Sequence, residues 1–333
     1  MEIIRNHRIG VLTSGGDAPG MNAAIRAVTR AALNHGMEVF GIRRGFQGMI
    51  ENEIFQLKSQ DVSGIIQSGG TFLQSTRSKD FKTQEGREKA YTNIKNLDID
   101  SLVVIGGDGS FTGANVFAQE YPEISVIGIP GTIDNDLYGT DYTIGYDTAL
   151  NTIIDAVDKI RDTASSFNRI FFVEVMGREA GFIAINSGIA SGAEVIMVPE
   201  RKNQMEKVRK FLKERALKNK SSIIIVAEGL EEGNAMEIAE KIKDEYPEFS
   251  IRVSVLGHIQ RGGRPTSKDR VIASLMGVAA IDAIIDNQKS IMIGWRNEEI
   301  VQVPLNKTVK MHKTISENML DIAEMIGTFL PQE

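Results

Sequence analysis

Short runs of apolar, mostly β-branched residues alternate along this chain with longer stretches in which apolar residues recur every three or four positions. The short runs predict strands at 9–12, 39–42, 102–105, 126–129, 170–175, 223–227, 252–256 and 291–293. Helical periodicity fills the gaps, for example at Met21, Ile25, Val28 and Ala32. Alternating strands and helices predict an α/β fold whose largely parallel sheets are covered by helices on both faces.

One further helix is expected near the C-terminal end. The stretch 314–317 reads Thr-Ile-Ser-Glu, which matches a capping box, and apolar residues then recur at Met319, Ile322, Ala323 and Ile326. We therefore expect Thr314 to cap this final helix.

The composition limits the class of protein. With 333 residues, of which 42% are hydrophobic, the chain can form two cores of ordinary domain size. The absence of cysteine excludes disulfides, thiolate catalysis and cysteine-ligated metals. The first eight residues lack the apolar centre of a signal peptide, and no apolar run approaches the roughly 20 residues that span a bilayer. We expect a soluble cytoplasmic protein with no membrane partner.

The charge distribution argues against nucleic acid as a partner. The net charge is −6 and no basic tract occurs. Any anionic ligand must therefore be bound by locally clustered arginines.

An acidic loop follows one of the predicted strands. Asp134 and Asp136 come shortly after the run 126–129, and in open α/β sheets such a loop is where catalytic groups project. The alternative from the residues alone is an Asx-turn, in which a carboxylate binds its own backbone.

Two glycine-rich turns each follow a predicted strand and precede a helix. They are 13–20, Thr-Ser-Gly-Gly-Asp-Ala-Pro-Gly, and 106–110, Gly-Gly-Asp-Gly-Ser. Glycine lets the backbone approach a phosphate closely, and a helix N-terminus favours negative charge. Neither turn is a Walker A loop or a dinucleotide-binding loop, and glycines that only make tight turns are the alternative. An aspartate in each turn favours phosphate with magnesium, and Asp108 is the better metal candidate.

With the acidic loop, these turns resemble the ATP-dependent 6-phosphofructokinase family over nearly the whole chain. The stretches that carry the resemblance are 9–26, 103–110, 130–136, 173–178 and 255–263. Gly-Gly-Asp-Gly alone is also similar to lipid and NAD kinases, but the five stretches in this order point to one family. The resemblance implies the phosphofructokinase fold, with two doubly wound, Rossmann-like domains. It assigns 1–145 plus 260–310 to a larger nucleotide-binding domain, and 146–259 plus 311–333 to a smaller sugar-phosphate-binding domain.

The resemblance also implies a reaction, the committed step of glycolysis, in which ATP and Mg²⁺ phosphorylate the 1-hydroxyl of fructose 6-phosphate. Asp134 would act as general base, and Thr132 would hold the transferring phosphoryl group. Asp136 would help to position Mg²⁺, and Arg178 would neutralise the phosphoryl oxygens. From the residues alone, Arg178 could equally form a surface ion pair with a neighbouring glutamate.

The family's remaining ligand positions can be matched residue by residue. Those for the substrate are Thr132, Ile133, Asp134, Arg169, Met176, Gly177, Arg178, Glu228, Arg252, His258 and Arg261. Those for the nucleotide are Gly16, Arg77, Ser78, Gly107, Asp108, Gly109 and Ser110, with Asp108 at the metal. In this family Arg169 and Arg252 reach in from a neighbouring subunit, which implies a homotetramer with shared sites. Gln74 and Thr76 depart from the smaller pair usual in bacterial members.

The phosphoryl donor is expected to be ATP. Pyrophosphate-dependent relatives typically carry an aspartate at the position of Gly109 and a lysine at that of Gly131, and two small residues leave room for a nucleotide. A pyrophosphate-dependent enzyme, a non-catalytic regulatory subunit and a kinase for another sugar phosphate remain the alternatives. The retained base, metal ligand and arginine speak against the regulatory subunit.

An effector site for ADP or phosphoenolpyruvate is a further implication of the resemblance. It would be lined by Arg26, Arg30, Arg161 and Glu194, with Asn22 on the same helical face as the first two. A solvated helix face is the alternative from spacing alone. Ser59 and the stretch 217–222 depart from the family pattern, so we expect weak or altered effector control.

Overall fold

The fold, a computed structural model, describes residues 7–166, 169–216, 221–247, 249–326 and 328. The predictions for the first eight residues and for the stretch 217–222 therefore fall mostly outside the described residues. The chain forms two compact units. Unit 1 comprises Met1–Ile133, Leu137–Thr148 and Arg261–Lys313, and unit 2 comprises Asp134–Asp136, Ala149–Gln260 and Thr314–Glu333.

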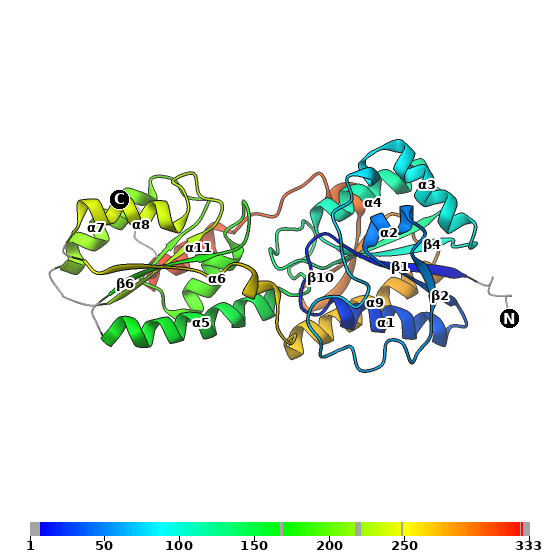
Figure 1. The fold of residues 1–333 in the computed structure, drawn as a ribbon, viewed down its shortest axis with the longest axis horizontal. Helices are drawn as coiled ribbons and strands as arrows, with labels where there is room; N and C mark the ends of the chain where they lie inside the picture. Colours follow the sequence, from blue (N-terminus) through cyan, green and yellow to red (C-terminus); the bar gives the residue numbers. More distant parts are fainter. Residues whose placement is uncertain (1–6, 167–168, 217–220, 248, 327, 329–333) are drawn as a thin grey trace. The chain divides into compact units, whose positions relative to one another are not determined.

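Unit 1 is built on a seven-stranded sheet in the order β11-β10-β5-β4-β1-β2-β3 (Figure 1). The strands are β1 Arg8–Ser14, β2 Glu38–Ile42, β3 Ile54–Leu57, β4 Ser101–Gly106, β5 Ser125–Pro130, β10 Ile291–Arg296 and β11 Glu299–Pro304. The inner strands run parallel, whereas the edge strands β3 and β11 are antiparallel to their neighbours. The strands predicted for this part of the chain are confirmed.

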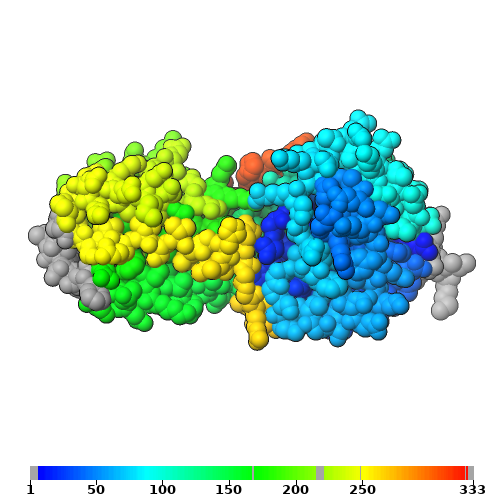
Figure 2. Space-filling model, viewed as in Figure 1, coloured from blue at the N-terminus to red at the C-terminus, as the bar shows by residue number. Residues whose placement is uncertain are grey.

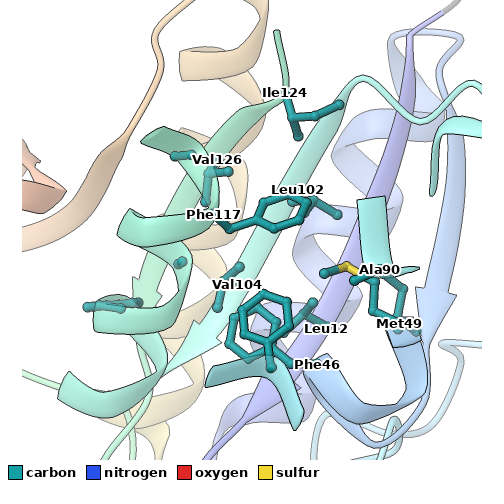
Figure 3. Packing of buried hydrophobic residues seen from close by; sticks show 14 of the residues in the cluster. Leu12, Phe46, Met49, Ala90, Leu102, Val104, Phe117, Ile124 and Val126 are labelled. Carbon is teal, nitrogen blue, oxygen red and sulfur yellow. The ribbon is translucent and has the colours of Figure 1, made fainter. Parts of the chain in front are cut away.

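Helices cover both faces of this sheet (Figure 1). On one face α1 (Met21–Asn34) packs against α9 (Ser267–Ile285). The other face carries α2 Gly45–Ile50, α3 Gln84–Lys95, α4 Asp108–Glu120, α10 Leu305–Thr308 and the short helix η1 Asp80–Lys82. There Leu102 and Val104 of β4 pack with Phe46 and Phe117 in a buried hydrophobic cluster (Figure 3). A sheet buried on both faces needs apolar side chains in both directions, which explains the unbroken apolar runs.

Unit 2 contains a four-stranded, fully parallel sheet in the order β7-β8-β6-β9. Its strands are β6 Ile170–Val175, β7 Val195–Met197, β8 Ser222–Ala227 and β9 Ile251–Val255. The helices of this part of the chain are α5 Tyr146–Ser166, α6 Phe182–Ser191, α7 Gln204–Ala216, α8 Ala235–Glu245, α11 Glu317–Met325 and the short η2 Gly257–Arg261. Side chains of the strands, α7 and α8 form a hydrophobic core on one face of this sheet. Helix α8, drawn in yellow, lies at the surface in the space-filling view (Figure 2). Both units are thus doubly wound α/β structures, as predicted.

The start of the last helix was predicted wrongly. Helix α11 begins at Glu317, and its cap is Ser316, whose hydroxyl accepts a hydrogen bond from the Met319 backbone N–H at 3.3 Å. Ser316 is the last residue with an extended backbone, at φ −70° and ψ 142°, and a cap must occupy that position. Thr314 therefore lies too early to fill it. Among the residues described, no helix combines the length and apolar character needed to cross a bilayer.

A buried carboxylate in unit 1 holds the beginning of α5. Asp269, in the first turn of α9, accepts hydrogen bonds from the backbone N–H groups of Gly145 at 2.8 Å and Thr148 at 2.9 Å, and from the Thr148 hydroxyl. It thus caps α5 from more than a hundred residues away. Burial raises the pKa of Asp269 to about 6, although these hydrogen bonds act in the opposite direction.

Asp269 should make folding stability depend on pH. Between its ordinary pKa of 3.8 and the raised value of about 6, the folded state keeps a proton that the unfolded state has lost, so stability falls as pH rises. We expect the unfolding free energy of the wild type, relative to Asp269→Asn, to be about 1 kcal/mol larger at pH 5 than at pH 7.5. Urea unfolding of both proteins at both pH values measures this difference. A difference independent of pH would show that the carboxylate is already charged at pH 5.

Candidate functional site

The predicted phosphate-binding residues of unit 1 gather at the carboxyl ends of three neighbouring strands, β1, β4 and β5. Because these strands are parallel and in register, Ser14 pairs with Gly106 and Gly106 with Pro130. The Gly131 N–H donates to the Gly106 carbonyl at 2.9 Å, which continues the pairing past the strands. The two glycine turns and the start of the acidic loop therefore lie side by side.

The glycines in these turns allow close packing. A Cβ added to Gly106 would lie 2.6 Å from the Ser110 hydroxyl, and one on Gly107 would lie 3.3 Å from Thr132 Cβ. In contrast, a Cβ on Gly109 would meet no atom within 4 Å. Thr132 itself is buried, and its carbonyl accepts a hydrogen bond from the Thr143 hydroxyl at 2.6 Å. The turn 106–110 is thus packed on the side of Thr132 and open at Gly109.

Asp108 lies beside this turn, where its carboxylate is placed to bind a cation. It is the first residue of α4, at the helix end where backbone N–H groups favour an anion. Its side chain is half-buried and makes no hydrogen bond or ion pair with any described residue. The carboxylate oxygens are therefore available to a hard cation.

The predicted nucleotide residues Arg77 and Ser78 differ in their surroundings. Arg77 is exposed, whereas the Ser78 hydroxyl donates to the Gln47 side chain at 2.6 Å and accepts from the Phe81 N–H at 3.1 Å. Ser78 thereby fixes the turn that enters η1. Of the two side chains, Arg77 is the more exposed and, among the described residues, makes no contact that fixes it in this turn.

In unit 2, the acidic loop meets an arginine. Asp134 is 1% exposed, and its Oδ2 lies 3.3 Å from Arg178 Nε. Arg178 and Asn135 both have a left-handed backbone, at φ 53° and 55°, and Asp136 is half-buried. A buried carboxylate held against a guanidinium can accept a proton or orient a hydroxyl group.

The segment Met176–Gly177–Arg178 is held by two side chains. Glu228, which follows β8, accepts hydrogen bonds from the N–H groups of Gly177 at 3.3 Å and Arg178 at 2.8 Å. Gln260 is fully buried, and its amide oxygen accepts from the Met176 N–H at 3.1 Å while its amide nitrogen donates to the Gly257 carbonyl at 2.9 Å. The sequence reasoning missed Gln260, because nothing local distinguishes a glutamine that binds backbone 84 residues away.

The predicted sugar-phosphate residues of unit 2 lie at opposite ends of its sheet. Met176, Glu228 and His258 follow the carboxyl ends of β6, β8 and β9, whereas Arg169 directly precedes β6 and Arg252 is near the start of β9. At about 3.3 Å per residue, Arg169 and Met176 are roughly 20 Å apart along the sheet.

Arg261 is the last residue of η2, three residues after His258, and its side chain contacts unit 1. Its guanidinium donates to the Asp17 carbonyl at 3.2 Å, and a Cβ on Gly16 would lie 2.5 Å from its Nη1. The structure therefore brings Arg261 to the first glycine turn.

The predicted effector residues form separate groups. In unit 2, Arg161 lies 3.2 Å from Glu194 and donates to the carbonyls of Ser191 and Gly192 at the end of α6. In unit 1, Arg26 and Arg30 are half-buried on α1. Asn22, one turn before Arg26 on the same helix, is only 3% exposed.

The Asn22 side chain forms hydrogen bonds with the loop 68–72. Its amide nitrogen donates to the Ser68 carbonyl at 3.1 Å, and its oxygen accepts from the Phe72 N–H at 2.6 Å. Its side chain therefore serves loop structure rather than the helix surface.

The chain is similar to known proteins over most of its length. Residues 8–284 match the family model described as Phosphofructokinase. The chain is 58% identical to ATP-dependent 6-phosphofructokinase 2 of Bacteroides thetaiotaomicron, over 96% of this chain and 98% of that protein. It is 52% identical to ATP-dependent 6-phosphofructokinase 1 of Thermus thermophilus, over 96% and 99%. Among solved structures, phosphofructokinase from Saccharomyces cerevisiae is similar with a TM-score of 0.84 and 36% identity, over 96% of this chain and 46% of that one.

Proposed function

The chain belongs to the phosphofructokinase family, and we propose from this premise that it transfers the γ-phosphoryl group of ATP to the 1-hydroxyl of fructose 6-phosphate. The products are ADP and fructose 1,6-bisphosphate. Relatives named ATP-dependent 6-phosphofructokinase, at 52% and 58% identity, support both the donor and the acceptor. In this proposal unit 1 binds the nucleotide and unit 2 binds the sugar phosphate.

The observation that carries the proposal is the buried Asp134 carboxylate paired with Arg178. As the sugar oxygen forms its bond to the γ-phosphorus, the bond from that phosphorus to the bridging oxygen of ADP breaks, and Asp134 accepts the hydroxyl proton. Arg178, 3.3 Å from Asp134, neutralises charge on the phosphoryl oxygens. Thr132, two residues earlier and packed against Gly107, is proposed to hold the phosphoryl group.

The residues present fit a magnesium ion that is held mainly by substrate. No described group of three or more histidine or acidic side chains is arranged to hold a metal. Mg²⁺ is commonly bound by one or two carboxylates together with substrate phosphates, and Asp108 offers such a carboxylate beside the glycine turn. Asp136 is the second candidate. When bound, the ion would neutralise charge on the phosphates.

The open space at Gly109 supports ATP as donor. A side chain there would project into room that a nucleotide needs, and no described atom lies within 4 Å of its Cβ position. Gly131 supports ATP as donor less strongly, because a Cβ at this position would lie 3.0 Å from side-chain atoms of both Ile105 and Met21. Packing alone therefore favours glycine at that position. The remaining nucleotide contacts are proposed for Gly16, Arg77 and the turn 107–110.

The sugar phosphate is proposed to bind at a site shared between two subunits of a homotetramer. Met176–Arg178, Glu228 and His258 lie at the carboxyl ends of the unit 2 sheet, but Arg169 and Arg252 lie towards its amino ends. One subunit's sheet therefore cannot present all of them to one small ligand. A second subunit can supply Arg169 and Arg252, whose planar groups suit a phosphate.

Effector control is proposed to be weak. Arg161 already serves the end of α6 and Glu194, and Glu194 also accepts from the Ile223 N–H at 2.7 Å. Arg161 can therefore bind an anion such as ADP or phosphoenolpyruvate only at the cost of these internal partners. Ser59 supplies no charge.

We expect purified protein to release ADP from Mg-ATP and fructose 6-phosphate, and not to use pyrophosphate. Asp134→Ser should lower turnover by roughly 10²- to 10⁴-fold, because it removes the base and leaves a small polar side chain. A coupled assay of ADP production measures both. Asp155→Ser, at a side chain 68% exposed on α5, is the matched control and should retain full turnover. Unchanged turnover of Asp134→Ser would mean that another group is the base.

The shared site predicts complementation between two proteins that each have little activity at low fructose 6-phosphate concentration. Arg252→Ala should raise the KM for fructose 6-phosphate by roughly 10- to 100-fold, through loss of a charge-assisted hydrogen bond. When Arg252→Ala and Asp134→Ser are unfolded together and refolded as hybrids, about a quarter of the sites should combine both intact halves. Activity at low sugar concentration reports this. Hybrids that form, as seen by native electrophoresis of differently tagged chains, but stay inactive would contradict the sharing.

Weak effector control predicts a nearly hyperbolic dependence of rate on fructose 6-phosphate. Millimolar ADP or phosphoenolpyruvate should shift the half-saturating sugar concentration less than about threefold, equivalent to under 1 kcal/mol of coupling. Initial rates with and without each effector measure the shift. A strongly sigmoidal curve that micromolar ADP relieves would contradict the proposal.

A further inference from the structure

Gln74 has a left-handed backbone, with φ 60°, in the loop beside the first glycine turn. Side chains disfavour this conformation, which glycine adopts freely and asparagine and aspartate tolerate. Most of the other described non-glycine residues at positive φ are asparagine or aspartate. Arg44 and Arg178 are held there by ion pairs, and Ser290 and Glu298 lie in turns next to β10.

The backbone, not the side chain, fixes the conformation of Gln74. Its N–H donates to the Thr71 carbonyl at 3.0 Å, and its carbonyl accepts from the Thr13 hydroxyl at 2.7 Å. On either side, the Leu73 carbonyl accepts from the Arg44 N–H at 2.9 Å and the Ser75 hydroxyl donates to the Gly15 carbonyl at 2.7 Å. A glycine would keep all of these hydrogen bonds and remove the strain.

The Gln74 side chain has no structural task among the described residues. It is exposed and makes no hydrogen bond or ion pair with any of them. A strained residue that contributes nothing to packing is a reason to look for a ligand.

The position of Gln74 indicates which ligand. The loop is attached to Thr13 and Gly15, at the carboxyl end of β1, and to Arg44, just past the end of β2. This is the edge of the sheet that also carries Gly107 and Asp108, after β4, and β4 is the neighbour of β1. Arg77 is three residues further along. A carboxamide, with two donor hydrogens and an acceptor oxygen, suits phosphate oxygens and ribose hydroxyls.

We propose that Gln74 is a nucleotide-binding residue, whose amide binds the nucleotide donor at the carboxyl ends of β1 and β2. The inference deepens the proposed function and rests on its assignment of ATP to unit 1. It accounts for a strained glutamine where a glycine would fold at lower cost.

Gln74→Gly and Gln74→Glu test this role. Gln74→Gly should raise the Kd for Mg-ADP by about 3- to 10-fold, as expected for one neutral hydrogen bond, while the melting temperature stays equal or rises. Gln74→Glu keeps the length but places a negative charge near the polyphosphate, so it should weaken binding more than glycine does. The KM for fructose 6-phosphate should change less than twofold in both. Isothermal titration calorimetry with Mg-ADP, thermal unfolding and initial rates provide these values.

Asn52→Gly is the matched control. Asn52 is an exposed amide in the same unit with the same φ of 60°, in the turn before β3, so its replacement removes an amide side chain from the same backbone conformation in a different loop. Its Mg-ADP affinity should equal that of the wild type. Unchanged affinity in Gln74→Gly, or equal losses for both substrates with a lowered melting temperature, would overturn the inference. Because Mg-ADP binding is measured without turnover, absence of kinase activity in the wild type would refute the proposed function separately.

Discussion

The parallel, doubly covered sheets decide where this protein can place charge. β4, β5 and β8 are buried along their whole length, so none of them can carry an ionised group within the strand. An ionised side chain can first reach solvent or a polar partner in the residues that follow the carboxyl ends of these strands. Asp108, Asp134 and Glu228 all occupy such positions. The direction of the strands therefore places these three carboxylates beyond the carboxyl ends of the sheets.

This constraint also explains how far the sequence could be interpreted. The inner strands and the loops that follow them were predictable, because long apolar runs and their flanking glycines are local signals. The strands β3, β7 and β11 were not, because a short or edge strand needs less apolar sequence. Gln260 and Asp269 were also missed as structural ligands of backbone N–H groups. Their partners lie 84 and 124 residues away in the chain, and neither spacing nor composition reports such contacts.

The acidic loop and its arginine are held in a conformation that costs energy. Asn135 and Arg178 have left-handed backbones, and Gly177 has φ 141°. Glycine adopts such a backbone freely and asparagine tolerates it, whereas at Arg178 it costs of the order of 1 kcal/mol and persists because the surroundings dictate it. Here Glu228 binds two consecutive N–H groups of the Gly177–Arg178 turn. These hydrogen bonds hold the backbone that carries the Arg178 guanidinium, so under the proposed mechanism less reorganisation is needed when charge develops.

The two arginines towards the amino ends of β6 and β9 have a consequence for evolution under the shared-site proposal. Arg169 and Arg252 lie at the end of the unit 2 sheet away from Met176 and Glu228. In a monomer, substitution of these two residues would not affect binding of the sugar phosphate. In an assembly they become ligands in a neighbour's site, so selection for catalysis acts on quaternary structure. A lineage of such proteins cannot lose its oligomeric state gradually, since the first step away from association already removes two of the proposed ligands of the sugar phosphate.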